Sequence, residues 1–204
     1  GQLAGKTAFV TGSSRGIGAD TVGYFAEAGA RVAINYRDKE ARAEKVAAAL
    51  GRFTHSSQWS DIASADLIIE AVFEDLEVKH AVFEQIDAHA NPQALLASNT
   101  SYLDIDAIAA KTQNPSRVFG LHFFSPAQVM KLIEIVRCKL TDPSVIAAAL
   151  QFAKRLGKTP VISANAFGFI GNRIYAAYRR QCEFMLEEGA YPEQVDKALE
   201  EYGF

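Results

Sequence analysis

Residues 8–18 read AFVTGSSRGIG, and this stretch decides the fold. An apolar run leads into Gly12, and Gly16 and Gly18 open the segment that follows. Glycines are needed where a backbone bends sharply and approaches a pyrophosphate, and the free N–H groups at the start of a helix bind anions. A strand, a glycine-rich turn and a helix in this order predict a dinucleotide-binding unit. The alternative is a purely structural turn.

Apolar and amphipathic segments alternate along most of the chain. We expect strands at residues 6–11, 31–36, 66–72, 94–98, 117–124, 131–136 and 159–163, and helices at 16–29, 38–50, 76–90, 103–110 and 142–156. Residues 51–60 are ambiguous and fit a short strand and a loop. This alternation predicts an α/β fold, a doubly wound and mostly parallel Rossmann-type sheet, over residues 1–165. Residues 166–204 have a helical pattern, which we expect to be the beginning of a truncated C-terminal helical domain.

Composition excludes several classes of protein. The 204 residues carry a formal net charge of -3 and contain no long basic run, so we expect no nucleic-acid partner. No apolar stretch approaches the roughly 20 residues that span a bilayer, so we expect no membrane partner. The two cysteines, Cys138 and Cys182, have no metal-like spacing. They predict no metal site, free thiols and a cytoplasmic location.

The glycine spacing of the first turn, Gly-x-x-x-Gly-x-Gly, resembles the short-chain dehydrogenase/reductase family over about residues 4–50. The resemblance includes AGARV at 28–32 and NYR at 35–37. It implies a nicotinamide dinucleotide as cofactor, with the turn residues Gly12, Ser14, Arg15, Gly16, Ile17 and Gly18 as its cradle. NAD is the expected form, and Arg37 leaves NADP open because an arginine can hold the 2′-phosphate. The alternative for Arg37 is a solvated loop residue.

The catalytic residues of that family are missing. Short-chain enzymes need a tyrosine with a lysine four residues later, and no tyrosine of this chain is followed by lysine at that distance. Short-chain chemistry therefore has no visible catalyst here.

A second resemblance extends from about residue 58 to the end. It rests on DLIIEAVFEDLEVK at 66–79, SNTSYLDI at 98–105, GLHFFSPAQVMKLIEIV at 120–136 and GFIGNR at 168–173. These four segments resemble the 3-hydroxyacyl-CoA dehydrogenases of fatty-acid β-oxidation. The resemblance implies an acyl-CoA substrate and oxidation of its 3-hydroxyl group. Because two families are resembled in succession, the chain looks chimeric.

His122 and Glu134 are the expected catalytic pair. Oxidation of a secondary alcohol needs a base for the hydroxyl proton, and histidine titrates near physiological pH. Glu134 lies on the next expected strand, and a turn at residues 125–128 would fold it back onto the imidazole. A carboxylate there would fix the imidazole tautomer and stabilise the imidazolium. The alternative is a core histidine with a surface glutamate.

The second resemblance implies further site residues. Ser101 and Asn172 would hold the substrate oxygens, with Ser101 also beside the nicotinamide, while Glu74 and Lys79 would line the cofactor site. Ser125 follows His122, and some relatives carry asparagine there near the nicotinamide. The alternatives are a helix cap for Ser101, surface charges for Glu74 and Lys79, and an interhelical amide for Asn172.

The expected function is interconversion of (S)-3-hydroxyacyl-CoA and 3-oxoacyl-CoA with a nicotinamide dinucleotide. A non-catalytic NAD(P)-binding module is one alternative, and a short-chain carbonyl reductase is another. We also expect a homo-oligomer, because apolar residues of the helical tail lack an obvious partner. These residues are Phe169, Ile170, Ile174, Tyr175, Tyr178 and Met185.

Overall fold

The computed structural model describes residues 3–11, 16–35, 53–127 and 129–204. Gly12, Ser14 and Arg15 of the expected turn, Arg37 and the helix expected at 38–50 lie outside these ranges.

Within these ranges, eight strands form one sheet in the order β3-β2-β1-β4-β5-β6-β7-β8. Their bounds are β1 Thr7–Val10, β2 Arg31–Asn35, β3 Phe53–Ser56, β4 Leu67–Glu70, β5 Leu95–Ser98, β6 Val118–Phe123, β7 Leu132–Arg137 and β8 Thr159–Ala164. Every neighbouring pair is parallel except β6 and β7, which are antiparallel. The mostly parallel α/β sheet predicted from the sequence is therefore confirmed, and the ambiguous 51–60 segment supplies β3.

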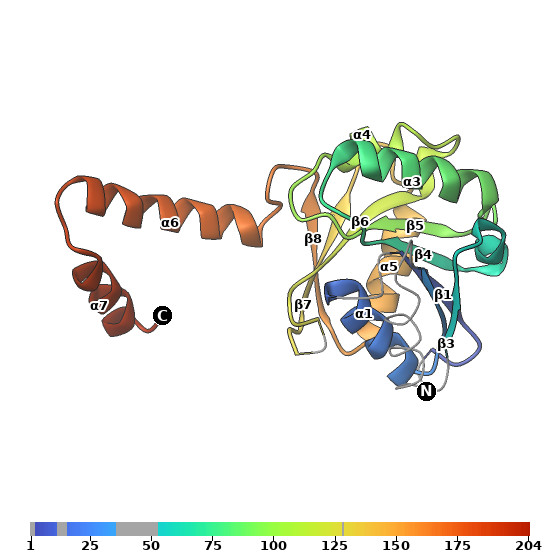
Figure 1. Cartoon of the computed structure of the whole chain (residues 1–204), viewed down its shortest axis with the longest axis horizontal. Helices are drawn as coiled ribbons and strands as arrows, with labels where there is room; N and C mark the ends of the chain where they lie inside the picture. Colours follow the sequence, from blue (N-terminus) through green and yellow to red (C-terminus); the bar gives the residue numbers. More distant parts are fainter. Residues whose placement is uncertain (1–2, 12–15, 36–52, 128) are drawn as a thin grey trace.

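Helices cover both faces of the sheet (Figure 1). They are α1 Gly16–Glu27, α3 Leu76–His89, α4 Ile105–Ala109 and α5 Pro143–Arg155. Phe25 of α1 and Ala149 of α5 belong to one buried core, and Phe83 of α3 and Ile108 of α4 belong to a second core. Because the central strands are buried on both faces, they read as continuous apolar runs rather than alternating ones.

Asparagine and aspartate side chains fix where several helices begin. Asp75 accepts a hydrogen bond from the Val78 amide at the start of α3, and Asp142 accepts one from the Ser144 amide at the start of α5. Two short 3-10 helices, η1 Trp59–Ser64 and η2 Pro115–Arg117, complete the connections, with Asn114 capping η2.

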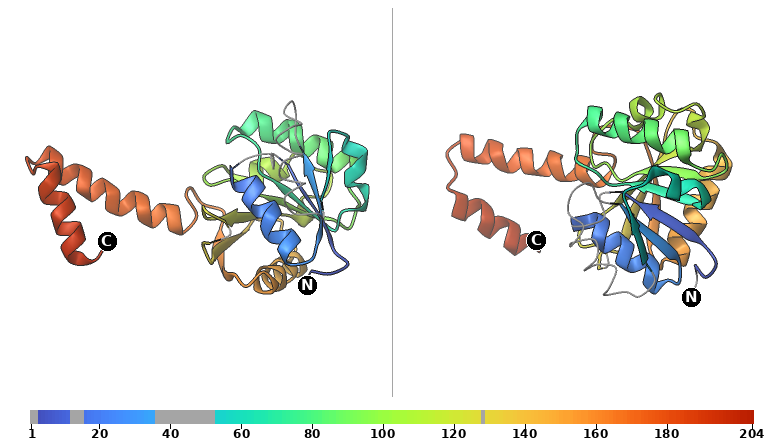
Figure 2. Two further views of the ribbon diagram at one scale, coloured as in Figure 1. Left: turned by 60° about the horizontal axis from the view of Figure 1, so that its bottom comes forward. Right: turned by 45° about the vertical axis from the view of Figure 1, so that its right-hand side comes forward.

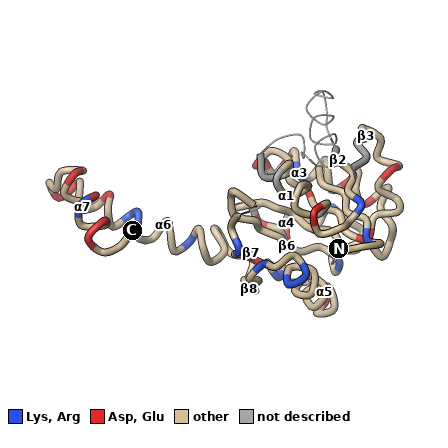
Figure 3. Tube along the Cα trace, turned by 90° about the horizontal axis from the view of Figure 1, so that it is seen from below, with Lys and Arg blue, Asp and Glu red and all other residues tan. Residues whose placement is uncertain are grey.

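Two further helices, α6 Gly171–Glu187 and α7 Pro192–Tyr202, project away from the sheet (Figures 1 and 2). No residue of α6 is buried, and Val195 is the buried residue of α7. Basic and acidic residues are interspersed over the sheet body and along α7 (Figure 3). Within the described ranges, none of the helices combines the length and the apolar character that crossing a bilayer requires.

Candidate active site

The candidate site lies where the parallel strands end. The hydroxyl oxygen of Thr11, directly after β1, accepts a hydrogen bond from the Ala71 amide after β4 at 3.0 Å. The side-chain oxygen of Asn99, after β5, accepts one from the Phe123 amide of β6 at 2.9 Å. Since β1, β4, β5 and β6 run parallel, their carboxyl ends share one edge, where ligands bind in open α/β sheets. His122 therefore lies on the edge where the glycine-rich turn begins.

His122 and Glu134 meet at this edge. They are paired positions of the antiparallel β6–β7 ladder, so their side chains leave the same face of the sheet. Nδ1 of His122 lies 2.8 Å from Oε2 of Glu134, and the two residues are 4% and 1% exposed. With the carboxylate at Nδ1, the favoured neutral tautomer carries its proton there, and Nε2 is the acceptor nitrogen of the ring.

The second oxygen of Glu134 binds the start of α6. Oε1 accepts hydrogen bonds from the amides of Ile170 at 2.9 Å and Gly171 at 2.8 Å. The first amides of a helix lack partners within it, and a carboxylate satisfies them and complements the helix dipole. Both oxygens of Glu134 are therefore engaged, and the carboxylate is fixed in place.

Two aromatic rings flank the imidazole of His122. The Phe124 ring lies 4.6 Å and the Phe169 ring 5.6 Å from it, centroid to centroid. The expectation that Phe169 lacks a partner is wrong, because it packs against His122 and is 3% exposed. Its backbone has φ 49°, a left-handed conformation that turns the chain into α6. The two rings contribute to the burial of the imidazole, which is 4% exposed.

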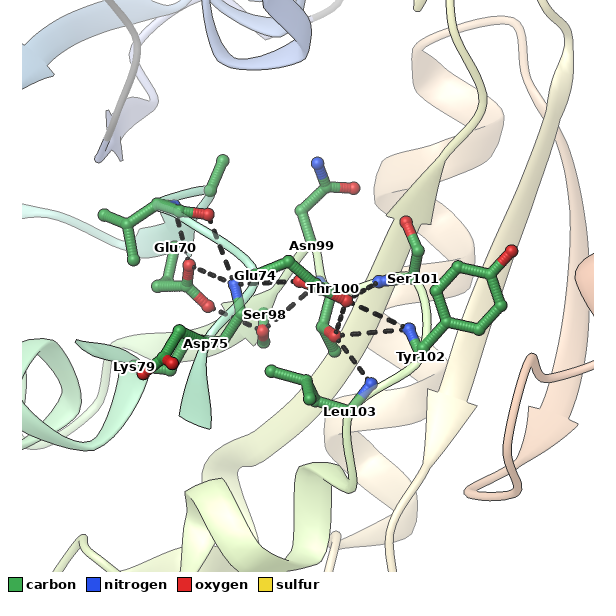
Figure 4. Close-up of polar contacts among 12 residues, drawn as sticks. Glu70, Glu74, Asp75, Lys79, Ser98, Asn99, Thr100, Ser101, Tyr102 and Leu103 are labelled. Atoms are coloured by element: carbon green, nitrogen blue, oxygen red, sulfur yellow. Dashed lines mark hydrogen bonds and ion pairs between the residues drawn. The ribbon is translucent and has the colours of Figure 1, made fainter. Parts of the chain in front are cut away.

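The Glu74 carboxylate holds the loop that carries Ser101 (Figure 4). Oε1 of Glu74 accepts hydrogen bonds from the Thr100 hydroxyl at 2.6 Å and from the amides of Ser101 at 2.8 Å and Tyr102 at 3.1 Å. Partial burial opposes ionisation, but these hydrogen bonds and the Lys79 ammonium keep the pKa of Glu74 below its ordinary value. Glu74 thus positions Ser101 through its backbone.

Lys79 is fully buried beneath this loop (Figure 4). Its ammonium lies 2.7 Å from Oε1 of Glu70 and 3.4 Å from Oε2 of Glu74. The other oxygen of Glu70 accepts a hydrogen bond from the Ser98 hydroxyl at 2.6 Å. Lys79 therefore bridges two carboxylates in the structure, and its contact with a cofactor stays a prediction.

Glu70 and Ser98 are site residues that the sequence reasoning missed. A usable signal existed, because Glu70 is a charged residue inside the otherwise apolar stretch DLIIEAV. Glutamate is almost never fully buried unless it is paired, so its position in a buried strand indicates a partner.

Asn172 and Ser125 complete the set of predicted residues. The side-chain amide of Asn172, in the first turn of α6, donates to the backbone oxygen of Ser101 at 3.3 Å. The structure thus brings Ser101, Asn172, Glu134 and His122 into one network. Ser125 is exposed directly beyond the end of β6. Of the glycine-rich turn, Gly16, Ile17 and Gly18 form the first residues of α1.

A doubly wound sheet with a His–Glu pair at its carboxyl edge defines a Rossmann-type dehydrogenase domain. The model of the 3-hydroxyacyl-CoA dehydrogenase NAD-binding domain matches residues 20–166, and the model of the C-terminal domain of the same enzymes matches residues 168–204. The chain belongs to the 3-hydroxyacyl-CoA dehydrogenase family.

Curated relatives and solved structures agree with this assignment. The chain is 48% identical to a peroxisomal bifunctional enzyme of Cavia porcellus over 73% of its own length and 20% of that protein. It is 44% identical to the peroxisomal bifunctional enzyme of Danio rerio over 87% of its length and 25% of that protein. The chain thus spans a quarter or less of these relatives.

Among solved structures, 3-hydroxybutyryl-CoA dehydrogenase from Escherichia coli superposes with a TM-score of 0.86 and 34% identity. The match covers 91% of this chain and 44% of that one.

Proposed function

We propose that this chain catalyses the NAD-dependent interconversion of (S)-3-hydroxyacyl-CoA and 3-oxoacyl-CoA. The buried contact between His122 and Glu134 at the carboxyl edge carries this proposal, because it supplies the base that alcohol oxidation needs. The match to the 3-hydroxyacyl-CoA dehydrogenase family and the similarity to 3-hydroxybutyryl-CoA dehydrogenase from Escherichia coli support the same substrate class.

In the proposed mechanism, Nε2 of His122 takes the proton of the substrate hydroxyl during oxidation and returns it during reduction. Glu134 fixes the imidazole and stabilises its charged form, as the aspartate of a hydrolytic triad does. The Ser101 hydroxyl and the Asn172 amide hold the substrate oxygens. An amide donor near the carbonyl would stabilise negative charge that develops there during reduction.

The dinucleotide, when bound, supplies the hydride acceptor. The described residues fit it, because α1 begins at Gly16, shortly after β1 ends at Val10, and the start of a helix favours a pyrophosphate. Gly12, Ser14, Arg15, Gly16, Ile17 and Gly18 would form this cradle, with Glu74, Lys79, Ser101 and Ser125 further along the cofactor. Arg37 would decide between NAD and NADP, which calorimetric titration with each nucleotide distinguishes.

Reduction of acetoacetyl-CoA, followed at the nicotinamide absorbance, tests the proposal. His122→Gln should lower kcat by about 10²- to 10⁴-fold, the usual contribution of a general acid–base residue. His89→Gln is the matched control, since His89 is an exposed residue at the end of α3. An unchanged rate in His122→Gln would remove the mechanism, and stabilisation by NADH without turnover would favour a non-catalytic binding module.

We further propose that residues 4–50 follow the short-chain pattern and that the chain is chimeric. This proposal is supported by the family match, which starts only at residue 20, after the glycine-rich turn.

A homo-oligomer formed through the C-terminal helices is supported by exposed Ile174, Tyr175 and Met185 on α6. A dimer or larger species by light scattering is the expected result. The free thiols of Cys138 and Cys182 suit a reducing, cytoplasmic compartment.

A further inference from the structure

Lys158, directly before β8, is a buried lysine that the proposed mechanism does not use. It is 7% exposed. Its ammonium donates hydrogen bonds to the backbone oxygens of Ala127 and, at 2.7 Å, Met130. Among the described residues, no carboxylate lies within ion-pairing distance of it. A buried ammonium without a counter-ion is costly, and carbonyl oxygens here replace its water.

Both carbonyls belong to the connection between β6 and β7, residues 124–131. Inside this connection the amides of Val129 and Met130 donate to the Pro126 oxygen at 3.0 and 2.9 Å. The amide of Thr159 donates to the Lys131 oxygen at 2.8 Å. Three carbonyl oxygens of the connection are therefore bound from this segment. The Lys158 ammonium binds two of them, and the backbone amide of Thr159 binds the third.

The same ammonium contacts the helix that follows the glycine-rich turn. It lies 4.4 Å from the centroid of the Tyr24 ring of α1, within the range of a cation–π interaction. The Tyr24 hydroxyl donates to the Leu156 oxygen at the end of α5, which holds the ring in place. Burial lowers the pKa of Lys158, because it removes water from around the charged ammonium.

The connection joins the strand that carries His122 to the strand that carries Glu134. The two strands meet in an antiparallel register that pairs these residues, and Ser125 lies in the connection itself. A displaced connection would move the imidazole relative to the carboxylate, and a misplacement of about 1 Å can cost about 100-fold in rate.

We propose that Lys158 is a positioning residue of the dehydrogenase site: by holding the Ala127 and Met130 oxygens against α1, it fixes the β6–β7 connection and the contact between His122 and Glu134. This inference rests on the proposed function for its kinetic consequence. Its structural consequence can be measured without turnover.

The test compares Lys158→Met, Lys158→Gln and the control Lys154→Met. Methionine keeps much of the volume and removes every donor, whereas glutamine keeps an amide group that can donate to both carbonyls. Lys154 is exposed on α5, so its loss controls for the missing charge. Lys158→Met should lower kcat about 10- to 100-fold with little change in KM, while Lys158→Gln recovers most of the rate and Lys154→Met keeps it.

A second readout is the imidazole signal of His122 in protein labelled with 15N-histidine, assigned by its loss in His122→Gln. Lys158→Met should shift this signal and speed amide exchange at residues 129–131. If Lys158→Met does not fold, Tyr24→Leu, which removes the ring that the ammonium contacts, provides the same two readouts. A folded Lys158→Met or Tyr24→Leu protein with an unshifted His122 signal and slow exchange would overturn the inference. If the wild-type protein shows no turnover while the variants still show the shifted His122 signal and the faster exchange, the result counts only against the proposed function.

Discussion

The amide nitrogen of Gly171 lies 2.8 Å from Oε1 of Glu134, so the carboxylate that holds His122 also holds the first turn of α6. The next residue of that turn, Asn172, donates to the Ser101 oxygen. The segments at 98–105, 120–136 and 168–173 are therefore parts of one hydrogen-bonded unit. The position of α6 and the orientation of the imidazole depend on the same side chain.

Glu134→Gln should impair both functions of this carboxylate. Glutamine has one acceptor oxygen, so it cannot serve the imidazole and the two α6 amides as the carboxylate does. We expect kcat to fall by up to about 10⁴-fold, the loss reached when the acid of a comparable triad is neutralised. Amide exchange at Ile170 and Gly171 should quicken. Glu193→Gln, an exposed change on α7, is the control, and a wild-type rate in Glu134→Gln would contradict the role of the pair.

Gly171→Ala should disturb the same junction by steric means. A Cβ atom there would lie 2.9 Å from Cζ of Phe124, whose ring contacts the His122 imidazole. Overpacking of this kind costs about 1–3 kcal/mol in the free energy of unfolding, which urea denaturation measures. The rate should fall as well, because Phe124 must move. Phe124→Leu in the same protein should restore part of the stability, and equal losses in single and double variants would argue against this clash.

Cys138 and Cys182 should differ in reactivity. Burial, with repulsion from Asp106 and Asp104, raises the pKa of the Cys138 thiol to about 12. At pH 8 the Cys138 thiol is therefore protonated and inaccessible, whereas Cys182 on α6 is only half-buried. Iodoacetamide should add one label to the native protein and two in urea, as measured by intact mass, and Cys182→Ser should leave the native protein unlabelled. Two labels on folded wild-type protein would contradict the buried thiol.

The sequence predicted the parts of the site that depend on local pattern. Strand residues alternate between faces, so His122 and Glu134, on adjacent strands joined by a turn, could be placed together, and a slip of one residue would have separated them. Helix ends were less predictable: α4 starts only at Ile105 because the Asp104 side chain accepts from the Asp106 amide. The two hydrogen bonds that Glu134 accepts at the start of α6 were not predictable. They join Glu134 to amides that lie 36 and 37 positions later in the sequence, and only tertiary packing brings these groups together.

Glu74 gives the Ser101 loop a predictable dependence on pH. The pKa of Glu74 is lowered from its ordinary value of 4.5, so the folded protein binds this proton less readily than the unfolded chain. The stabilisation of the fold by ionised Glu74 is fully present above the pKa that Glu74 has in the unfolded chain. It is lost as the pH falls through the lower pKa of Glu74 in the folded protein. The three donors to its Oε1 are the Thr100 hydroxyl and the amides of Ser101 and Tyr102, so protonation should release these two amides.

Thr100→Val removes the hydroxyl donor and keeps the shape of the side chain. The pKa of Glu74 should then rise, because one of the interactions that favours the charged form is lost. Amide exchange at Ser101, whose amide donates to Glu74, should therefore quicken at a higher pH in Thr100→Val than in the wild-type protein. Thr159→Val, a similar change at an exposed position of β8, should not change the pH at which amide exchange in the Ser101 loop quickens. Coincident exchange profiles for Thr100→Val and wild type would mean that Glu74 does not hold the loop, and Ser101 would then need another support.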